Sequence, residues 1–259
     1  MKTSALKIKM SRPRGSTSSS LAAKAALFLG FSVASSAIAY DAGLDFSPTL
    51  NPNGVWSYGY STTLSGNVSL YTIHGSYPST PFDYWSLGSG GAAPSVFHNS
   101  SGNTITNNSG GSYQVWSPHL IGFHPGQFDE RSTIRFTAPA VGQYHLTASF
   151  SGLDSAGTTT DVHILKNSVS IYEGNVNGFL VSTAPFDTTL LLQPGDLLDF
   201  KLGYGSDGNY ASDTTGLSAQ IVLVPEPGTG LVALAACCAV IGARRVRGAS
   251  KALPRGAAL

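Results

Sequence analysis

Residues 132–150 read STIRFTAPAVGQYHLTASF, and this stretch decides the fold class. Polar and apolar residues alternate at both of its ends, as they do in half-buried strands, with Ile134 and Phe136 on one side and Tyr144 and Leu146 on the other. Between them, the segment APAVG places proline and glycine where a turn needs them. The pattern therefore predicts two antiparallel strands joined as a hairpin.

The same pattern of short strands and turns continues to residue 224. The expected strands and turns are a hairpin of 161–166 with 169–172 around Asn167-Ser168, strands 188–192 and 197–202 around Gln193-Pro-Gly-Asp196, and a last strand 215–224. Turn signals at intervals of roughly 8–12 residues, without helical periodicity, predict an all-β antiparallel β-sandwich. We assign residues 40–224 to this domain.

The first half of the domain carries fewer signals. Residues 67–73 and 112–117 read as strands. Residues 86–112 are dominated by Gly, Ser and Asn, and we expect a long surface loop or flap there.

Charge limits the classes of function. Only 11% of the 259 residues are charged, well below the usual quarter, which argues against a helical cytoplasmic enzyme and against a coiled coil. Residues 40–224 hold 4 basic and 13 acidic side chains, a net charge of −9. A body with this charge does not bind nucleic acid by neutralising phosphates.

The amino-terminal segment 1–39 has the order of a secretory signal peptide. Basic residues precede an apolar run that begins at Leu21 and closes on Ala37-Ile38-Ala39, the small-x-small pattern that signal peptidase cleaves. We expect cleavage before Tyr40. The alternatives are a buried helix or a membrane anchor.

The carboxyl end has three parts. Pro225-Glu226-Pro227 comes first, then an apolar segment at 228–243, then Arg244, Arg245 and Arg247. Sixteen residues make roughly 24 Å of helix, just short of the ~30 Å hydrocarbon core, with the arginines on the cytoplasmic side. The only cysteines, Cys237 and Cys238, lie in this segment, so the body has no disulfide.

This order of parts at residues 225–247 resembles the PEP-CTERM sorting signal of exported bacterial proteins. The resemblance implies processing by an exosortase near the motif, while the chain is transiently anchored by a transmembrane helix at 228–243. Residues 248–259 would be a cytoplasmic tail, longer than is usual for this signal. An ordinary stop-transfer anchor is the alternative.

The body itself resembles another class. The phrases Phe136-Thr-Ala-Pro139 and Leu192-Gln-Pro-Gly-Asp196 are similar to those of jelly-roll carbohydrate-binding modules and galactose-binding-like domains. The resemblance spans about residues 113–224 and implies a jelly-roll-like sandwich with a glycan as its partner. Its motifs are turn residues, so they concern the fold more than the ligand.

Aromatic residues supply candidate ligand contacts, because rings stack on the apolar faces of sugars. We expect Trp56, Trp85 and Trp116 to fill the core. Candidate ligand-binding residues are Tyr204 and Tyr210, which flank an acidic loop, and His124.

The acidic loop also offers oxygen ligands for a structural calcium ion. These are Asp207, Asn209 and Asp213, although their spacing lacks the EF-hand pattern. Solvated loop acids are the alternative. No other cofactor is expected.

These observations predict an exported cell-surface or extracellular-matrix protein that is not an enzyme and is associated with a glycan or exopolysaccharide. A purely structural matrix protein is one alternative. A polysaccharide hydrolase is another, although the chain has neither Gly-x-Ser-x-Gly nor His-Glu-x-x-His. The expected processing partners are signal peptidase and an exosortase.

Overall fold

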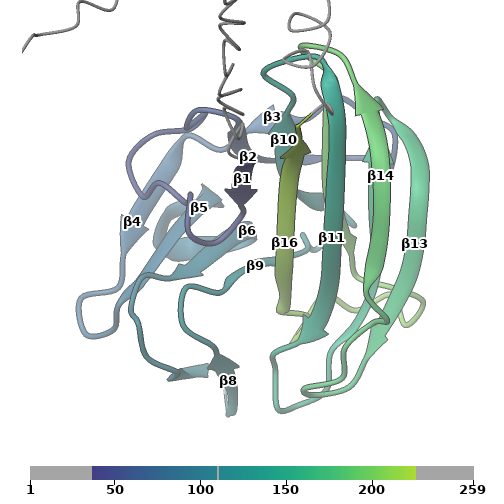
Figure 1. The fold of residues 1–259 in the computed structure, drawn as a ribbon. Coiled ribbons are helices and arrows are strands. Elements are labelled where there is room, and N and C mark those ends of the chain that lie inside the picture. The colour runs from purple at the N-terminus through teal and green to yellow at the C-terminus, as the bar shows by residue number, and fades with distance from the viewer. Residues whose placement is uncertain (1–36, 110, 226–259) are drawn as a thin grey trace, which may run out of the picture. The chain divides into compact units, whose positions relative to one another are not determined.

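The computed structural model describes residues 37–109 and 111–225 (Figure 1). The predicted signal peptide lies almost wholly outside these residues, and so do Glu226, Pro227, the apolar segment 228–243 and the tail. Within the described ranges, no helix is long and apolar enough to cross a bilayer.

The described residues form an antiparallel sandwich of two sheets, as the sequence predicts. One sheet has eight strands: β14 (Phe186–Leu192), β11 (Gly142–Gly152), β16 (Thr215–Val224), β9 (Ile121–His124), β6 (Ala92–Asn99), β5 (Phe82–Gly88) and β4 (Ile73–Ser76) in that order, with β1 (Ile38–Asp41) paired to β16. The other has six: β13 (Val169–Asn177), β12 (Thr159–Lys166), β15 (Leu197–Gly203), β10 (Arg131–Thr137), β2 (Trp56–Ser61) and β3 (Ser69–Leu70). A separate hairpin joins β7 (Ile105–Ser109) to β8 (Ser112–Trp116), and η1 (Ser89–Gly91) is a short 3-10 turn.

The hairpin predicted for residues 132–150 is wrong, because β10 and β11 belong to different sheets. Both strands bury one apolar face, and the connection 138–141 carries the chain across the sandwich so that these faces meet. The rings of Phe136 and Tyr144 lie 5.9 Å apart, edge to face, and the Tyr144 hydroxyl donates to the Ala140 carbonyl. Alternation shows which face is buried but not which strand is the partner.

The second predicted hairpin, around Asn167-Ser168, is confirmed as the β12–β13 connection. Both turn residues have positive φ angles, 49° and 69°, as a two-residue type I′ turn requires. The Asn167 carboxamide accepts from the Leu197 amide and donates to Asp196, which ties this turn to the next one. The strand predicted at 215–224 is also confirmed.

We predict that Ser168→Gly stabilises the protein by roughly 0.5–1 kcal/mol. Glycine adopts the left-handed conformation without the steric cost that serine bears there. Urea denaturation of the exported protein measures the effect. Gly195→Ala, at a φ of 87° in the neighbouring turn, is the control and should destabilise it. Equal stability of Ser168→Gly and the native chain would contradict the turn assignment.

The loop predicted for 86–112 is also wrong, because it contains η1, β6 and β7. β6 lies inside the eight-stranded sheet, and its small polar residues are buried rather than solvated. Asn99, for example, is fully buried and donates to the carbonyls of Asn103 and Ser117. The strand predicted at 67–73 is split into β3 and β4, because the chain changes sheets at the buried Tyr71.

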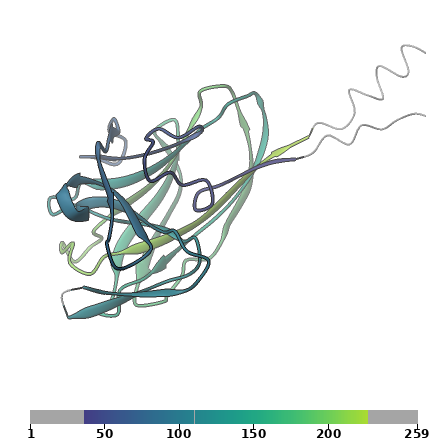
Figure 2. The same cartoon turned by 90° about the vertical axis from the view of Figure 1, so that its left-hand side faces the viewer.

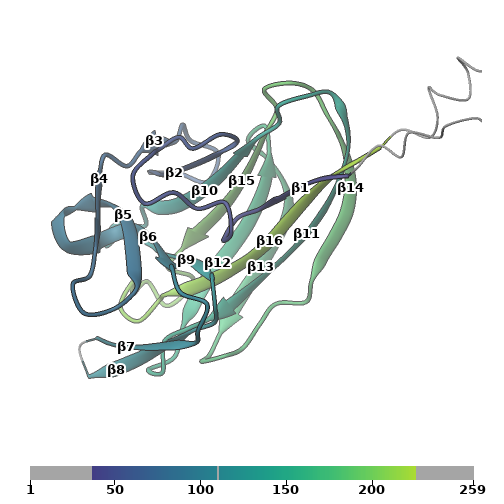
Figure 3. The ribbon, with the colours of Figure 1, turned by 60° about the vertical axis from the view of Figure 1, so that its left-hand side comes forward.

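The β7–β8 hairpin packs beside β5, β6 and β9 of the eight-stranded sheet (Figure 3), and the candidate site lies there. Phe82, Trp116 and Leu153 form a second apolar cluster there, with the Phe82 and Trp116 rings 4.6 Å apart. Gly122 lies under Trp116, and a Cβ at this glycine would meet the indole at 2.8 Å. The close approach therefore requires glycine.

The two ends of the described chain lie side by side (Figure 2), because Ile38 pairs with Leu223 near the end of β16. β16 runs away from this point for ten residues, roughly 33 Å at the usual rise per residue. The predicted cleavage point before Tyr40 lies inside β1, and cleavage there would leave Tyr40 paired with Ile221. That cleavage stays a prediction.

Candidate ligand-binding cavity

A cavity of about 580 Å³ opens to solvent between the β7–β8 hairpin, the outer faces of β6 and β9, and the loop after β15. Its lining includes Tyr77, Ser95, Phe97, Gln114, His124, Asp154 and Tyr210. The volume falls in the range of small-molecule sites. Two of the three residues predicted to bind a ligand, His124 and Tyr210, therefore meet in one place.

The floor of the cavity comes from β6 and β9. Alternation along β6 points Ser95 and Phe97 to the same outer face, while Val96 between them enters the main core. Ser95 is fully buried, and its hydroxyl has no hydrogen-bond partner among the described residues. Its cross-strand neighbour Ser86 is equally buried but donates to the Gly88 carbonyl. Buried hydroxyls normally have a hydrogen-bond partner. The missing partner of Ser95 therefore marks this floor as a candidate ligand site.

His124 lies at the end of β9, and a hydrogen bond fixes which of its ring nitrogens carries the proton. Its Nδ1 lies 2.8 Å from the Pro125 carbonyl oxygen and must donate to it, so in the neutral ring Nε2 is an acceptor. Burial lowers the pKa of His124 below its ordinary value, which keeps the ring neutral at pH 7. The His124 and Tyr210 rings meet edge to face, with centroids 6.0 Å apart.

Gln114 on β8 forms the opposite wall, and its amide is fully engaged. Its Nε2 donates to Thr214 at 2.8 Å and lies 3.4 Å from Asp154, while its Oε1 accepts from Trp116 at 3.3 Å and lies 3.4 Å from Asn107. These contacts join the hairpin to the loops that bear Asp154 and Thr214. Sequence reasoning missed Ser95 and Gln114, the first because its segment reads as a loop.

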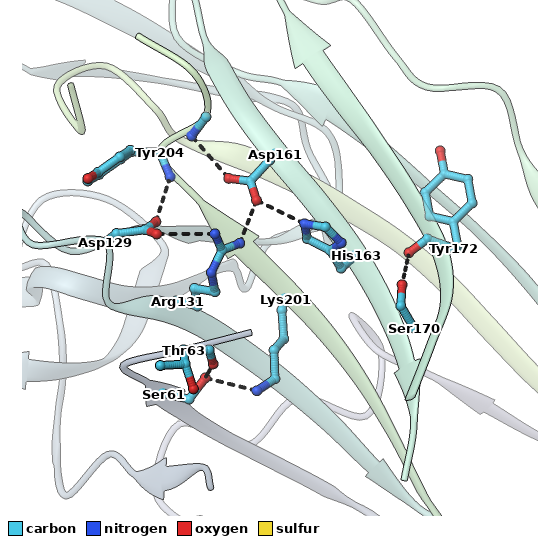
Figure 4. Close-up of polar contacts among 11 residues, drawn as sticks. Ser61, Thr63, Asp129, Arg131, Asp161, His163, Ser170, Tyr172, Lys201 and Tyr204 are labelled. Carbon is cyan, nitrogen blue, oxygen red and sulfur yellow. Dashed lines mark hydrogen bonds and ion pairs between the residues drawn. The ribbon is translucent and has the colours of Figure 1, made fainter. Parts of the chain in front are cut away.

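Tyr204, the third predicted ligand contact, does not line the cavity. It lies beside an ion-pair cluster on the six-stranded sheet (Figure 4), where its amide donates to Asp129. Arg131 bridges Asp129 at 3.1 Å and Asp161 at 2.5 Å, and His163 lies 2.9 Å from Asp161. Burial acts to raise the pKa of Asp161, but the hydrogen bonds from His163 and Arg131 outweigh it and lower the pKa. Both carboxylates are thus held in ion pairs.

The three tryptophans are buried, as expected for core residues. Trp56 and Trp85 belong to the main core and Trp116 to the cluster under the hairpin. The phenyl and phenol rings that line the cavity are instead those of Tyr77, Phe82, Phe97 and Tyr210.

The predicted calcium ligands lie near one another in the loop between β15 and β16. Thr159 joins two of them, donating from its hydroxyl to Asp207 at 2.7 Å and from its amide to Asp213 at 2.8 Å. Asn209 accepts from the Ala211 amide. Among the described residues, no three His, Cys, Asp or Glu side chains are arranged to hold a metal ion. Calcium binding stays a prediction.

Asp213 is fully buried, and its Oδ2 has no hydrogen-bond partner among the described residues. Burial raises the pKa of Asp213 to about 7, and the charges of Asp207 and Asp154 add to the effect. Below the carboxyl's ordinary pKa near 4 this group favours the folded state, and that contribution is lost as the pH rises from about 4 to 7.

We therefore predict that the free energy of unfolding of the native protein, taken relative to that of Asp213→Asn, decreases as the pH rises from 4 to 7. The change is at most a few kcal/mol, at about 1.4 kcal/mol per pKa unit. Urea denaturation at a series of pH values measures it. A difference that does not vary with pH would contradict the buried carboxyl. If calcium binds here, adding it at pH 7 stabilises the native chain and leaves Asp213→Asn unchanged.

Comparison with known proteins finds no matching family model and no matching curated protein. Similar solved structures include CBM51 from Clostridium perfringens GH95 in complex with methyl-galactose, at 13% identity and a TM-score of 0.33, covering 64% of this chain and 99% of that one. A family 35 carbohydrate-binding module from Clostridium thermocellum follows at 16% identity and a TM-score of 0.28, covering 48% and 89%. CBM51-2 and INT domains from Clostridium perfringens ZmpB share 12% identity at a TM-score of 0.35, covering 61% and 31%.

Carbohydrate-binding modules are thus among the similar structures. At this identity the likeness concerns the fold, and at these TM-scores it is distant. Function is therefore inferred from the cavity.

Proposed function

We propose that this chain is an exported, non-catalytic glycan-binding protein with a jelly-roll-like body, and that the cavity under the β7–β8 hairpin holds the sugar. The observation that carries the proposal is the unpartnered, buried hydroxyl of Ser95 on the cavity floor. Around it stand the Nε2 acceptor of His124 and the rings of Phe97 and Tyr210.

A sugar complements this combination of groups. Its hydroxyls supply the donors and acceptors that Ser95 and His124 lack, and its C–H faces pack on aromatic rings. Hydrolysis of a glycosidic bond in the usual mechanism needs two carboxyl groups flanking the bond. Asp154 is the one carboxylate among the residues that line the cavity. This supports binding rather than catalysis.

The cavity lies far from both ends of the described chain. Thr214 lines the cavity and immediately precedes β16, whereas both described chain ends lie at the far end of that strand. Both described chain ends are therefore roughly 30 Å from the cavity. We propose export through the signal peptide and sorting by an exosortase on the residues of segments 1–39 and 225–247.

We predict that Ser95→Ala weakens glycan binding about tenfold without lowering stability, because no hydrogen bond within the protein is lost. A panel of neutral, amino and acidic polysaccharides identifies the ligand, and calorimetry with the best oligosaccharide measures the dissociation constant. Ser86→Ala is the matched control. It should bind normally but lose roughly 1 kcal/mol of stability. Native affinity in Ser95→Ala would contradict the assigned cavity.

We also predict that replacing Pro225, Glu226 and Pro227 with alanine leaves an unprocessed, membrane-bound chain in the native host. Intact mass spectrometry of the surface fraction reads the result. The native protein should begin at Tyr40 and end near the motif. Normal processing of the triple variant would contradict sorting by an exosortase.

A further inference from the structure

The polar groups of the cavity divide unequally between donors and acceptors. The Gln114 amide donors point to Thr214 and Asp154, the Tyr77 hydroxyl donates to the Gly90 carbonyl, and the His124 Nδ1 proton is held by Pro125. His124 Nε2 and the remaining lone pairs of the Asp154 carboxylate are acceptors, and the unpartnered Ser95 hydroxyl can donate or accept. Among these groups acceptors outnumber donors, so the cavity favours a ligand that brings donors.

The cavity is also negatively charged. Asp154, which is 2% exposed, lies in its wall, where its carboxylate accepts from the Ala156 amide. Asp213 lies between the lining residues Ser212 and Thr214, but burial raises its pKa to about 7 and leaves it only partly ionised at neutral pH, so Asp154 supplies the charge of the lining. No lysine or arginine lines the cavity.

The basic residues of the body are engaged elsewhere. The Arg131 and Arg135 guanidinium groups pair with aspartates on the six-stranded sheet, and Lys201 donates to Ser61. Lys166 donates to the Leu191 carbonyl. The negative charge at the cavity is therefore not balanced by any basic residue of 40–224, which carries −9 overall.

Aromatic faces complete the arrangement. Tyr77, Phe97 and Tyr210 line the cavity, and aromatic rings attract cations as well as the C–H groups of sugars. An uncharged sugar uses the hydroxyl-binding groups but not the charge. An acidic sugar meets Asp154 with no cation to offset the repulsion.

We infer that the cavity binds a hexosamine with a free ammonium group in preference to a neutral or an acidic sugar. The inference rests on the proposed glycan-binding function. The ammonium supplies three donors and a positive charge to Asp154 and to the ring faces, while the sugar hydroxyls reach Ser95 and His124. Deacetylated hexosamine polymers are the class of exopolysaccharide that presents this group.

The test titrates the exported protein with a tetramer of glucosamine, its fully N-acetylated counterpart and a glucuronic acid oligomer by calorimetry. We expect the glucosamine tetramer to bind at least about tenfold more tightly than either of the others. Affinity for it should fall as the pH rises through the pKa of the sugar amine, because the neutral amine loses its charge. Equal or tighter binding of the N-acetylated tetramer would overturn the inference.

Asp154→Asn provides the variant, because asparagine keeps an oxygen to accept the Ala156 amide. It should bring the affinities for the glucosamine and N-acetylated tetramers to within about threefold of each other. Asp187→Asn is the charge-matched control, because its exposed carboxylate pairs with His145 and does not line the cavity. An unchanged preference in Asp154→Asn would overturn the inference, and the pH series on the native protein decides if that variant does not fold.

Further titrations distinguish binding of an amino sugar from a metal site and from binding of neutral sugars. Calcium chloride alone is titrated into the native protein and Asp154→Asn. Calcium binding that Asp154→Asn abolishes would show a metal site and overturn the amino-sugar inference. Binding of neutral sugars that remains sensitive to Ser95→Ala would overturn the inference but support the glycan function. If no sugar of any class binds, both fail.

Discussion

The candidate site depends on the side chain of Gln114. An amide has four hydrogen-bonding positions, and here all four have partners, from β7, β8 and two loops that lie far apart in the chain. Through them the β7–β8 hairpin is held against the loops before β12 and β16. The clamp acts together with the apolar cluster around Trp116 and with backbone hydrogen bonds from β8 to the loop that bears Leu153 and Ser155.

This hairpin changes the character of the eight-stranded sheet. An antiparallel sheet usually faces water on one side, but β5, β6 and β9 are covered on both. Their outward residues therefore sit in a low-dielectric environment, where an unpartnered hydroxyl such as Ser95 is costly. Ser95 carries that cost in the floor of the cavity.

Much of the fold could be predicted from the sequence because strand alternation and turn residues are local signals. The turn at Asn167-Ser168 and strand β16 were predicted correctly on that basis. The β10–β11 pairing was not, since Ile134 and Tyr144 show only that each strand has a buried face, and a short connection joins strands equally well within a sheet or across the sandwich. Residues 86–112 were misread because Ser95 and Asn99 are polar, and only the tertiary structure shows that they are buried.

Part of the candidate site was also predicted from local signals in the sequence. Tyr210 and His124 stood out as polar or aromatic residues beside turns, and they do meet in the cavity. Tyr204 is close to Tyr210 in sequence but belongs to a different polar cluster. Gln114 acts through contacts between segments far apart in the chain, and no local pattern marks such a residue.

A crystal structure of the exported protein with its best-binding oligosaccharide tests most directly whether the cavity under the hairpin is the glycan site. We predict one sugar ring packed against Phe97 or Tyr210, with a hydroxyl of that ring within hydrogen-bond distance of Ser95 Oγ. A sugar bound on another face, with only water in the cavity, would contradict the account.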